Sequence, residues 1–141
     1  MGQKEKHLEF IQSVINRMAV NSFWIKGWII TLVAALFVLS AKDSNNLYLL
    51  IAFLPIPAFW ILDGYYLWQE RLFRALYNYV RVKNGDQIDF SMKTNDLPKE
   101  FTSKKDTWIR SIFSITLGIF YGSLFAIMLI VMFLLCVKKG V

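Results

Sequence analysis

Three long runs of apolar residues divide this chain, and they constrain its fold more than any other feature. The runs cover residues 22–41, 47–68 and 111–137. About 20 apolar residues in a helix cross the 30 Å hydrocarbon core of a bilayer, so each run is long enough to be a membrane span. Hydrophobic residues make up 56% of the chain and charged residues only 18%, which is too apolar for a soluble domain of 141 residues. We therefore predict an all-α membrane protein with three transmembrane helices.

The basic residues outside the spans predict the orientation. Twelve of the 16 lie in the N-terminal segment and in residues 69–110, three lie on the other side, and Lys26 falls inside the first span. Because cytoplasmic loops are enriched in Lys and Arg, we expect the N-terminus and the central segment to be cytoplasmic and the C-terminus to lie outside.

The segments outside the spans complete the expected organisation. Residues 4–20 place Leu8, Ile11, Ile15 and Met18 on one helical face, which predicts an amphipathic helix. That helix would lie on the membrane surface, bundle with copies of itself or cap the mouth of an assembly. The predicted parts are an N-terminal helix (1–21), a transmembrane hairpin (22–68), a basic cytoplasmic appendage (69–110), a third transmembrane helix (111–137) and a short tail (138–141).

Two ionisable residues fall inside the predicted spans. Lys26 lies about one turn inside the cytoplasmic end of the first span, and Asp63 about a turn and a half before that end of the second. The two spans form an antiparallel hairpin, so these charges reach similar depth. A charge at the centre of a span costs about 2.5–3.5 kcal/mol, and less when paired. We expect an ion pair that holds the hairpin in register or a charge that lines a pore; the alternative is that both side chains snorkel to the headgroups.

Small residues recur at four-residue spacing on two spans. They are Gly27, Thr31 and Ala35 in the first span and Ser114, Gly118, Gly122 and Ala126 in the third. Such stripes let helices approach closely in lipid, either within one subunit or between subunits. We expect a homo-oligomer, with a tetramer favoured. In the second span, Pro55 and Pro57 predict a break in the helix near its middle.

The helix of the second span is expected to continue past Trp68 into the appendage. Arg74, Tyr77 and Arg81 combine guanidinium groups with an aromatic ring, as phosphate contacts and base stacking require. Lipid headgroups are the alternative partners, and they explain Arg71 and Arg74 better than Arg81 and Lys83. The candidate ligand-binding residues are Arg74, Tyr77, Arg81, Lys83, Lys104 and Lys105.

Two further patterns lie in the rest of the appendage. Residues 88–92 alternate between apolar and polar side chains, as in a short half-buried strand, which would either pair with a second copy of the chain or not form at all. Residues 103–106, "SKKD", resemble a capping box, so the third helix is expected to start near Lys104.

The composition argues against an enzyme. The chain has one His, His7, one Cys, Cys136, and no Gly-rich phosphate loop, so it shows no catalytic constellation. No metal site and no cofactor are expected.

The stretches "KEKHLEFIQSVINRMAVNSFWIKGW" and "QERLFRALYNYVR" resemble a group of small bacterial membrane proteins over roughly the first eighty residues. That group includes membrane effectors of anti-phage defence such as the effector of the Hailong system. The resemblance implies a channel that is held shut by short single-stranded DNA, which a partner nucleotidyltransferase makes, and whose opening depolarises the membrane. It implies no residue-level contacts.

Three functions follow as expectations. The first is a homo-oligomeric ion channel gated from the cytoplasm by an anionic nucleotide or short single-stranded DNA. The second is a non-conducting accessory or anchor subunit of a membrane complex. The third is a holin-like toxin without ligand control.

Overall fold

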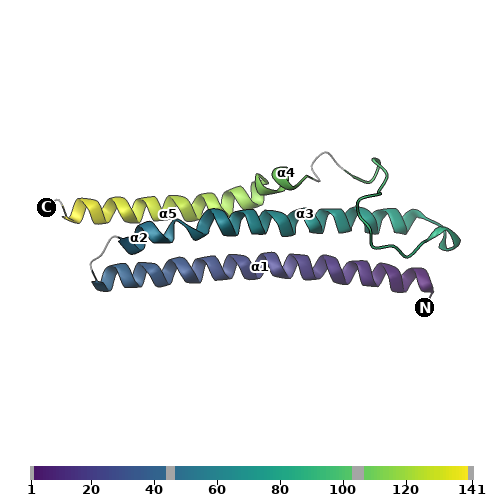
Figure 1. Cartoon of the computed structure of the whole chain (residues 1–141), viewed down its shortest axis with the longest axis horizontal. Helices are drawn as coiled ribbons and strands as arrows, with labels where there is room; N and C mark the ends of the chain where they lie inside the picture. Colours follow the sequence, from purple (N-terminus) through teal and green to yellow (C-terminus); the bar gives the residue numbers. More distant parts are fainter. Residues whose placement is uncertain (1, 44–46, 103–106, 140–141) are drawn as a thin grey trace.

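The computed structural model describes residues 2–43, 47–102 and 107–139, and the regular elements within them are all helical (Figure 1). Three of these elements are short, with three to six residues each. In chain order the elements are α1 (Gln3–Asp43), α2 (Leu47–Ala52), α3 (Pro55–Val82), η1 (Gly85–Gln87), α4 (Trp108–Ile112) and α5 (Ile115–Lys139).

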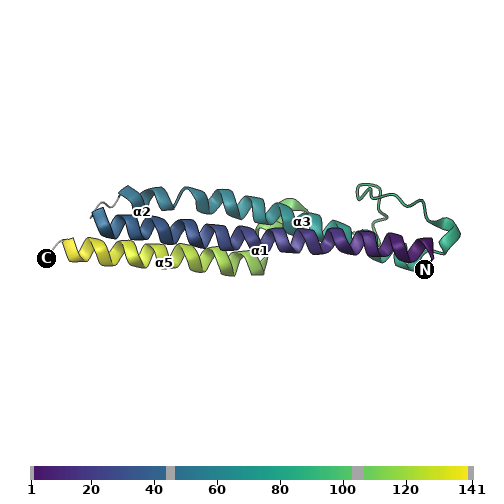
Figure 2. The same cartoon turned by 90° about the horizontal axis from the view of Figure 1, so that it is seen from below.

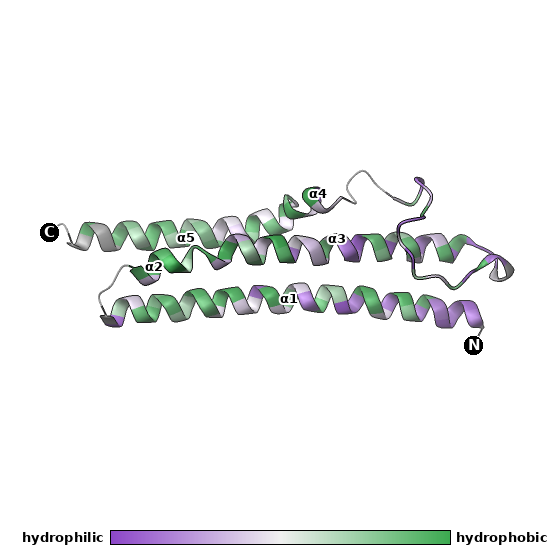
Figure 3. Ribbon diagram, viewed as in Figure 1, coloured by the Kyte–Doolittle hydropathy of each residue, from purple (hydrophilic) through white to green (hydrophobic). Residues whose placement is uncertain are grey.

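Three stretches of helix are long and apolar enough to cross a membrane, namely Gln3–Lys42, Leu47–Val82 and Ile115–Leu134. The first differs from its predicted form, because α1 runs unbroken through 41 residues and joins the N-terminal segment to the first span. At 1.5 Å per residue it is about 60 Å long, twice the thickness of a hydrocarbon core. Its N-terminal end is hydrophilic and its other end apolar (Figure 3).

The second span is interrupted at its prolines, as the sequence predicted. The N–H groups of Phe53 and Leu54 bond to carbonyls three residues back, at 3.2 and 3.1 Å, and α3 then starts at Pro55. Proline lacks an N–H and is tolerated in the first turn of a helix, which explains a fresh start at this residue. From there α3 runs for 28 residues to Val82, so the predicted continuation past Trp68 is confirmed.

The helices pack in two regions. In the apolar half, α5 lies alongside the antiparallel pair of α1 and α3 (Figures 1 and 2), and residues from all three helices share one core. Beyond that half, α1 and α3 continue as a two-helix stalk, which we define as residues 3–20 and 69–82. A second core of Ile11, Ile15, Leu76, Val80 and Ile88 holds the stalk together.

Two predictions for the appendage fare differently. Of the two alternatives for residues 88–92, the structure shows the one without a strand. These residues are irregular: Ile88 packs against the stalk and Phe90 has a positive φ of 54°. One alternating segment without a partner strand leaves its backbone hydrogen bonds unpaired, and is not stable by itself. Lys104 lies outside the described residues. The described part of the third helix starts at Trp108 and is broken at Phe113 and Ser114, between α4 and α5.

Candidate functional site

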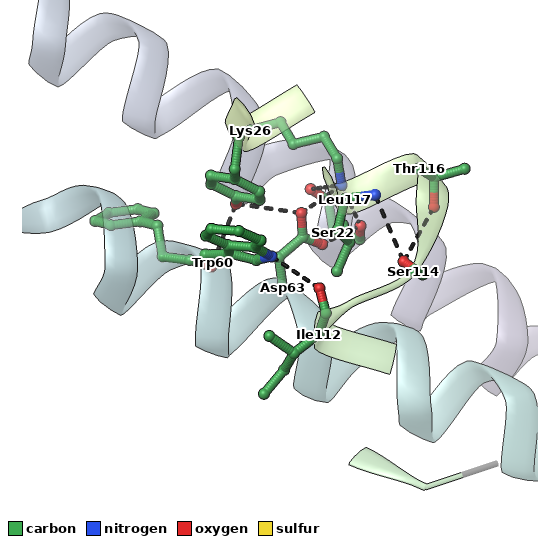
Figure 4. Close-up of polar contacts among 10 residues, drawn as sticks. Ser22, Lys26, Trp60, Asp63, Ile112, Ser114, Thr116 and Leu117 are labelled. Carbon is green, nitrogen blue, oxygen red and sulfur yellow. Dashed lines mark hydrogen bonds and ion pairs between the residues drawn. The ribbon is translucent and has the colours of Figure 1, made fainter. Parts of the chain in front are cut away.

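A buried polar centre joins the three long helices in their apolar half (Figure 4). The Nζ atom of Lys26 in α1 lies 2.5 Å from Oδ2 of Asp63 in α3, so the structure brings the two predicted intramembrane charges into an ion pair. The Asp63 side chain is fully buried, and 25% of the Lys26 side chain is exposed. The pair therefore closes off the carboxylate inside one protomer and leaves part of the lysine at the surface.

Two hydroxyl groups complete the polar centre. Ser22 donates a hydrogen bond to Oδ1 of Asp63 and accepts one from Lys26 Nζ at 2.7 Å. The hydroxyl oxygen of Tyr121, in α5, lies 3.2 Å from Oδ2 of Asp63 and 3.2 Å from the carbonyl oxygen of Phe59. A buried carboxylate is tolerated when it is paired and hydrogen-bonded, and Asp63 meets both conditions through contacts to two other helices.

Local spacing explains part of this arrangement. Ser22 and Lys26 are four residues apart, so both lie on the face of α1 that turns toward α3. Aromatic rings enclose the charges. Tyr121 stacks on Trp60 with centroids 5.6 Å apart, and Lys26 Nζ lies 5.8 Å from the centroid of the Phe120 ring. Ser22 and Tyr121 were not predicted, because a hydroxyl inside an apolar run has no distinctive sequence signal.

A glycine beside the polar centre sets how closely α3 and α4 approach. A Cβ atom at Gly64 would lie 2.5 Å from Cγ1 and 3.0 Å from Cα of Ile112. Trp60 Nε1 donates to the Ile112 carbonyl at 2.8 Å, and Arg71 donates to Oγ of the buried Ser111 at 3.1 Å. Gly64 was not predicted from the sequence, because its only signal is a lone glycine within a helical pattern.

The predicted packing stripes point away from the protomer's interior. A Cβ atom added at Gly27, Gly118 or Gly122 would meet nothing within 4 Å, so none of these glycines supports a close helix contact inside the subunit. Thr31, Ala35 and Ala126 are exposed, and Ser114 is half-buried. On α1 the stripe forms the floor of a groove of about 500 Å³ walled by Trp24, Trp28 and Leu32.

The candidate ligand-binding residues of the stalk differ in the contacts that their side chains already make. Arg74 pairs with Glu70, with Nη2 2.8 Å from Oε1, and Tyr77 is half-buried against the stalk core. Lys83 Nζ lies 4.2 Å from the centroid of the Tyr79 ring. The Arg81 side chain is exposed. Lys104 and Lys105 lie outside the described residues.

Lys4, which was not predicted as a site residue, joins α1 to the end of α3 at the tip of the stalk. Lys4 Nζ donates to the carbonyl oxygens of Arg81 at 3.0 Å and Lys83 at 2.5 Å. It thereby satisfies acceptors at the C-terminal end of α3, where cations are favoured. Nearby, His7 is buried with Nε2 unpartnered, and its ring meets Phe90 edge-on at 5.5 Å.

Within residues 2–43, 47–102 and 107–139, no group of three or more His, Cys, Asp or Glu side chains could hold a metal ion. In comparisons with known proteins, no family model, no curated protein and no solved structure matches the chain.

Proposed function

We propose that this chain is a homo-oligomeric ion channel of the bacterial inner membrane, gated from the cytoplasm by an anionic nucleotide or short single-stranded DNA. The observation that carries the proposal is that the glycines of both stripes make no close contact within the protomer. Small residues on a membrane helix favour close approach of another helix. Here that second helix would come from another copy of the chain.

The polar centre supports a conducting role. Ionisable residues within membrane spans are costly and mark ion pathways or other functional sites. Because Asp63 is fully buried and Lys26 only partly so, a pathway would run between protomers and not through one of them. Lys26 is the member of the pair that could face it.

The stalk supports control from the cytoplasm. Arg81 lies 13 residues beyond Trp68 on the continuous helix α3, which places it roughly 20 Å beyond the spans. That distance exceeds the Debye length of about 8 Å at physiological salt, so an exposed Arg81 serves a soluble anion better than it serves headgroups. Since α1 and α3 pass from stalk to spans without a break, movement at the tip can reach the polar centre.

The biological setting follows from the proposed ligand. Opening of such a channel would depolarise the membrane, which fits a non-enzymatic effector of anti-phage defence. The oligonucleotide would come from a partner nucleotidyltransferase.

A second function, a non-conducting accessory or anchor subunit, is favoured by one observation. Asp63 finds its ion-pair and hydrogen-bond partners inside one protomer, as it would if its role were to hold three helices together. The N-terminal helix of the stalk would then dock a protein partner.

Single-channel recording separates these functions. The purified full chain is placed in a planar bilayer, and conductance is measured before and after short single-stranded DNA is added. Conductance that the DNA changes in either direction supports the ligand-gated channel. A silent bilayer together with a monomer in detergent supports the accessory subunit, and conductance that is insensitive to DNA supports the toxin.

A further inference from the structure

A cavity of about 470 Å³ lies where α3, α4 and α5 meet, and arginines from two of these helices line it. The described residues that line it are Arg71, Arg110, Phe113, Ser114, Ile115 and Thr116. From the sequence, Arg71 was predicted as a possible headgroup contact, and the other five were not predicted to bind a ligand. We propose that this cavity is a specific site for the phosphate of an anionic phospholipid headgroup.

The first arginine is held in place at the cavity wall. Arg71 Nη1 donates to Ser111 Oγ at 3.1 Å, and Ser111 is fully buried. A guanidinium group is a planar fork of five N–H donors, so a hydrogen bond to a fixed hydroxyl orients the whole fork. Planar forks of this kind bind phosphate oxygens in a bidentate manner.

Other residues that line the cavity add a second cation and hydroxyl groups. Arg110 is exposed on α4, and the hydroxyl oxygens of Ser114 and Thr116 lie 3.3 Å apart. Among the described residues that line the cavity, none has an acidic side chain. The N-terminal end of the 25-residue α5 starts at Ile115, so its partial positive charge adds to that of the arginines.

The surroundings favour a lipid over a soluble phosphate. Arg71 follows Trp68 by three residues, and Ile115 opens the third span, so the proposed membrane placement puts the cavity at headgroup depth. Phe113 and Ile115, on the cavity wall, are 73% and 81% exposed and offer an apolar surface to acyl chains. Basic pockets between membrane helices on the cytoplasmic side commonly bind anionic headgroups.

Arg71 and Arg74, both predicted from the sequence as possible headgroup contacts, have different surroundings in the structure. Arg74 points its guanidinium at Glu70 on the same helix, at 2.8 Å, and is not among the residues that line the cavity. Non-specific attraction of anionic lipid to basic residues would involve both Arg71 and Arg74, whereas a specific site in the cavity involves Arg71 and Arg110. Arg74 is therefore a matched control.

The test measures lipid retention by native mass spectrometry of the full chain in detergent, titrated with phosphatidylglycerol or phosphatidylcholine. We expect Arg110→Gln and Arg71→Gln each to weaken phosphatidylglycerol binding about fivefold, as loss of one basic contact near a membrane surface predicts, and Arg74→Gln to leave it unchanged. Phosphatidylcholine should bind weakly to all variants. Arg110 is exposed, so its replacement tests the site even if Arg71→Gln disturbs the contact with Ser111.

Equal losses in all three arginine variants, or no loss in any, would overturn the site. Displacement of phosphatidylglycerol by millimolar glycerol 3-phosphate would assign the cavity to a soluble phosphate and overturn the lipid. The inference rests on the proposed membrane placement but not on conduction. Recovery of wild-type chain in the washed membrane fraction, with lipid binding unaffected by Arg110→Gln, would refute this inference alone; a chain absent from that fraction would refute the placement itself.

Discussion

Asp63 is the residue at which α1, α3 and α5 meet, and its ionised side chain depends on Lys26. Replacing Lys26 by Met keeps most of the stem but leaves a buried carboxylate without its counter-charge. Removal of one partner of a buried ion pair costs about 3–5 kcal/mol. We expect Lys26→Met to lower the stability of the folded chain in detergent by roughly 3 kcal/mol, measured as unfolding by helical circular dichroism during titration with SDS.

The matched variant for this pair removes both charges. Asp63→Asn keeps the shape of the side chain, and the double variant Lys26→Met/Asp63→Asn contains no unpaired charge. We expect the double variant to be more stable than Lys26→Met alone, because an uncharged pair avoids the desolvation cost. If the two substitutions instead add, the charges act independently and the pair does not hold the hairpin.

Among the helices, the contact between α3 and α4 gives the sharpest expectation, because two glycines can be compared. Gly64→Ala would press a methyl group against the backbone of Ile112, whereas Gly122→Ala would meet nothing within 4 Å. We expect Gly64→Ala to destabilise the chain by about 1–3 kcal/mol. Gly122→Ala should leave the folding of the protomer unchanged or favour it slightly, since Ala is the better helix former. Thermal unfolding of both variants in the same detergent compares them, and a stable Gly64→Ala would mean that α4 does not pack this closely.

The helices also show which parts of the fold could be predicted from the sequence and which could not. Hydropathy predicted the three apolar helices, and the spacing of polar and apolar residues predicted the extension of α3. Pro55 and Pro57 predicted the break in the second span. The antiparallel hairpin predicted that Lys26 and Asp63 lie at similar depth. Local patterns do not encode how a third helix sits against a hairpin, so Tyr121 and Gly64 were missed. The unbroken α1 was missed for a different reason: the change from an amphipathic to an apolar pattern near residue 21 alters the surroundings of a helix without ending it.

At the scale of the whole molecule, the exposed glycine stripes predict how copies associate. Gly118→Ile and Gly122→Ile add bulk where the protomer leaves open space, so folding should survive while close contact between copies does not. Light scattering of the detergent-solubilised chain should show a smaller assembly for these variants. The exposed Ile127→Leu is the control and should leave the assembly unchanged. An unaltered mass in the glycine variants would place the interface elsewhere.

The stalk predicts which arginine a soluble ligand needs. Arg74 is already compensated by Glu70, while Arg81 is exposed and its backbone carbonyl accepts a hydrogen bond from Lys4. We therefore expect Arg81→Gln to weaken the binding of fluorescently labelled single-stranded DNA more than Arg74→Gln does, measured by anisotropy at several salt concentrations. Loss of one phosphate contact should also reduce the slope of log K against log salt by about 0.7. Equal effects would show that the DNA responds only to net charge. If neither variant changes the binding of DNA, the stalk is not the gating site. The anchor subunit would then explain the long two-helix stalk better.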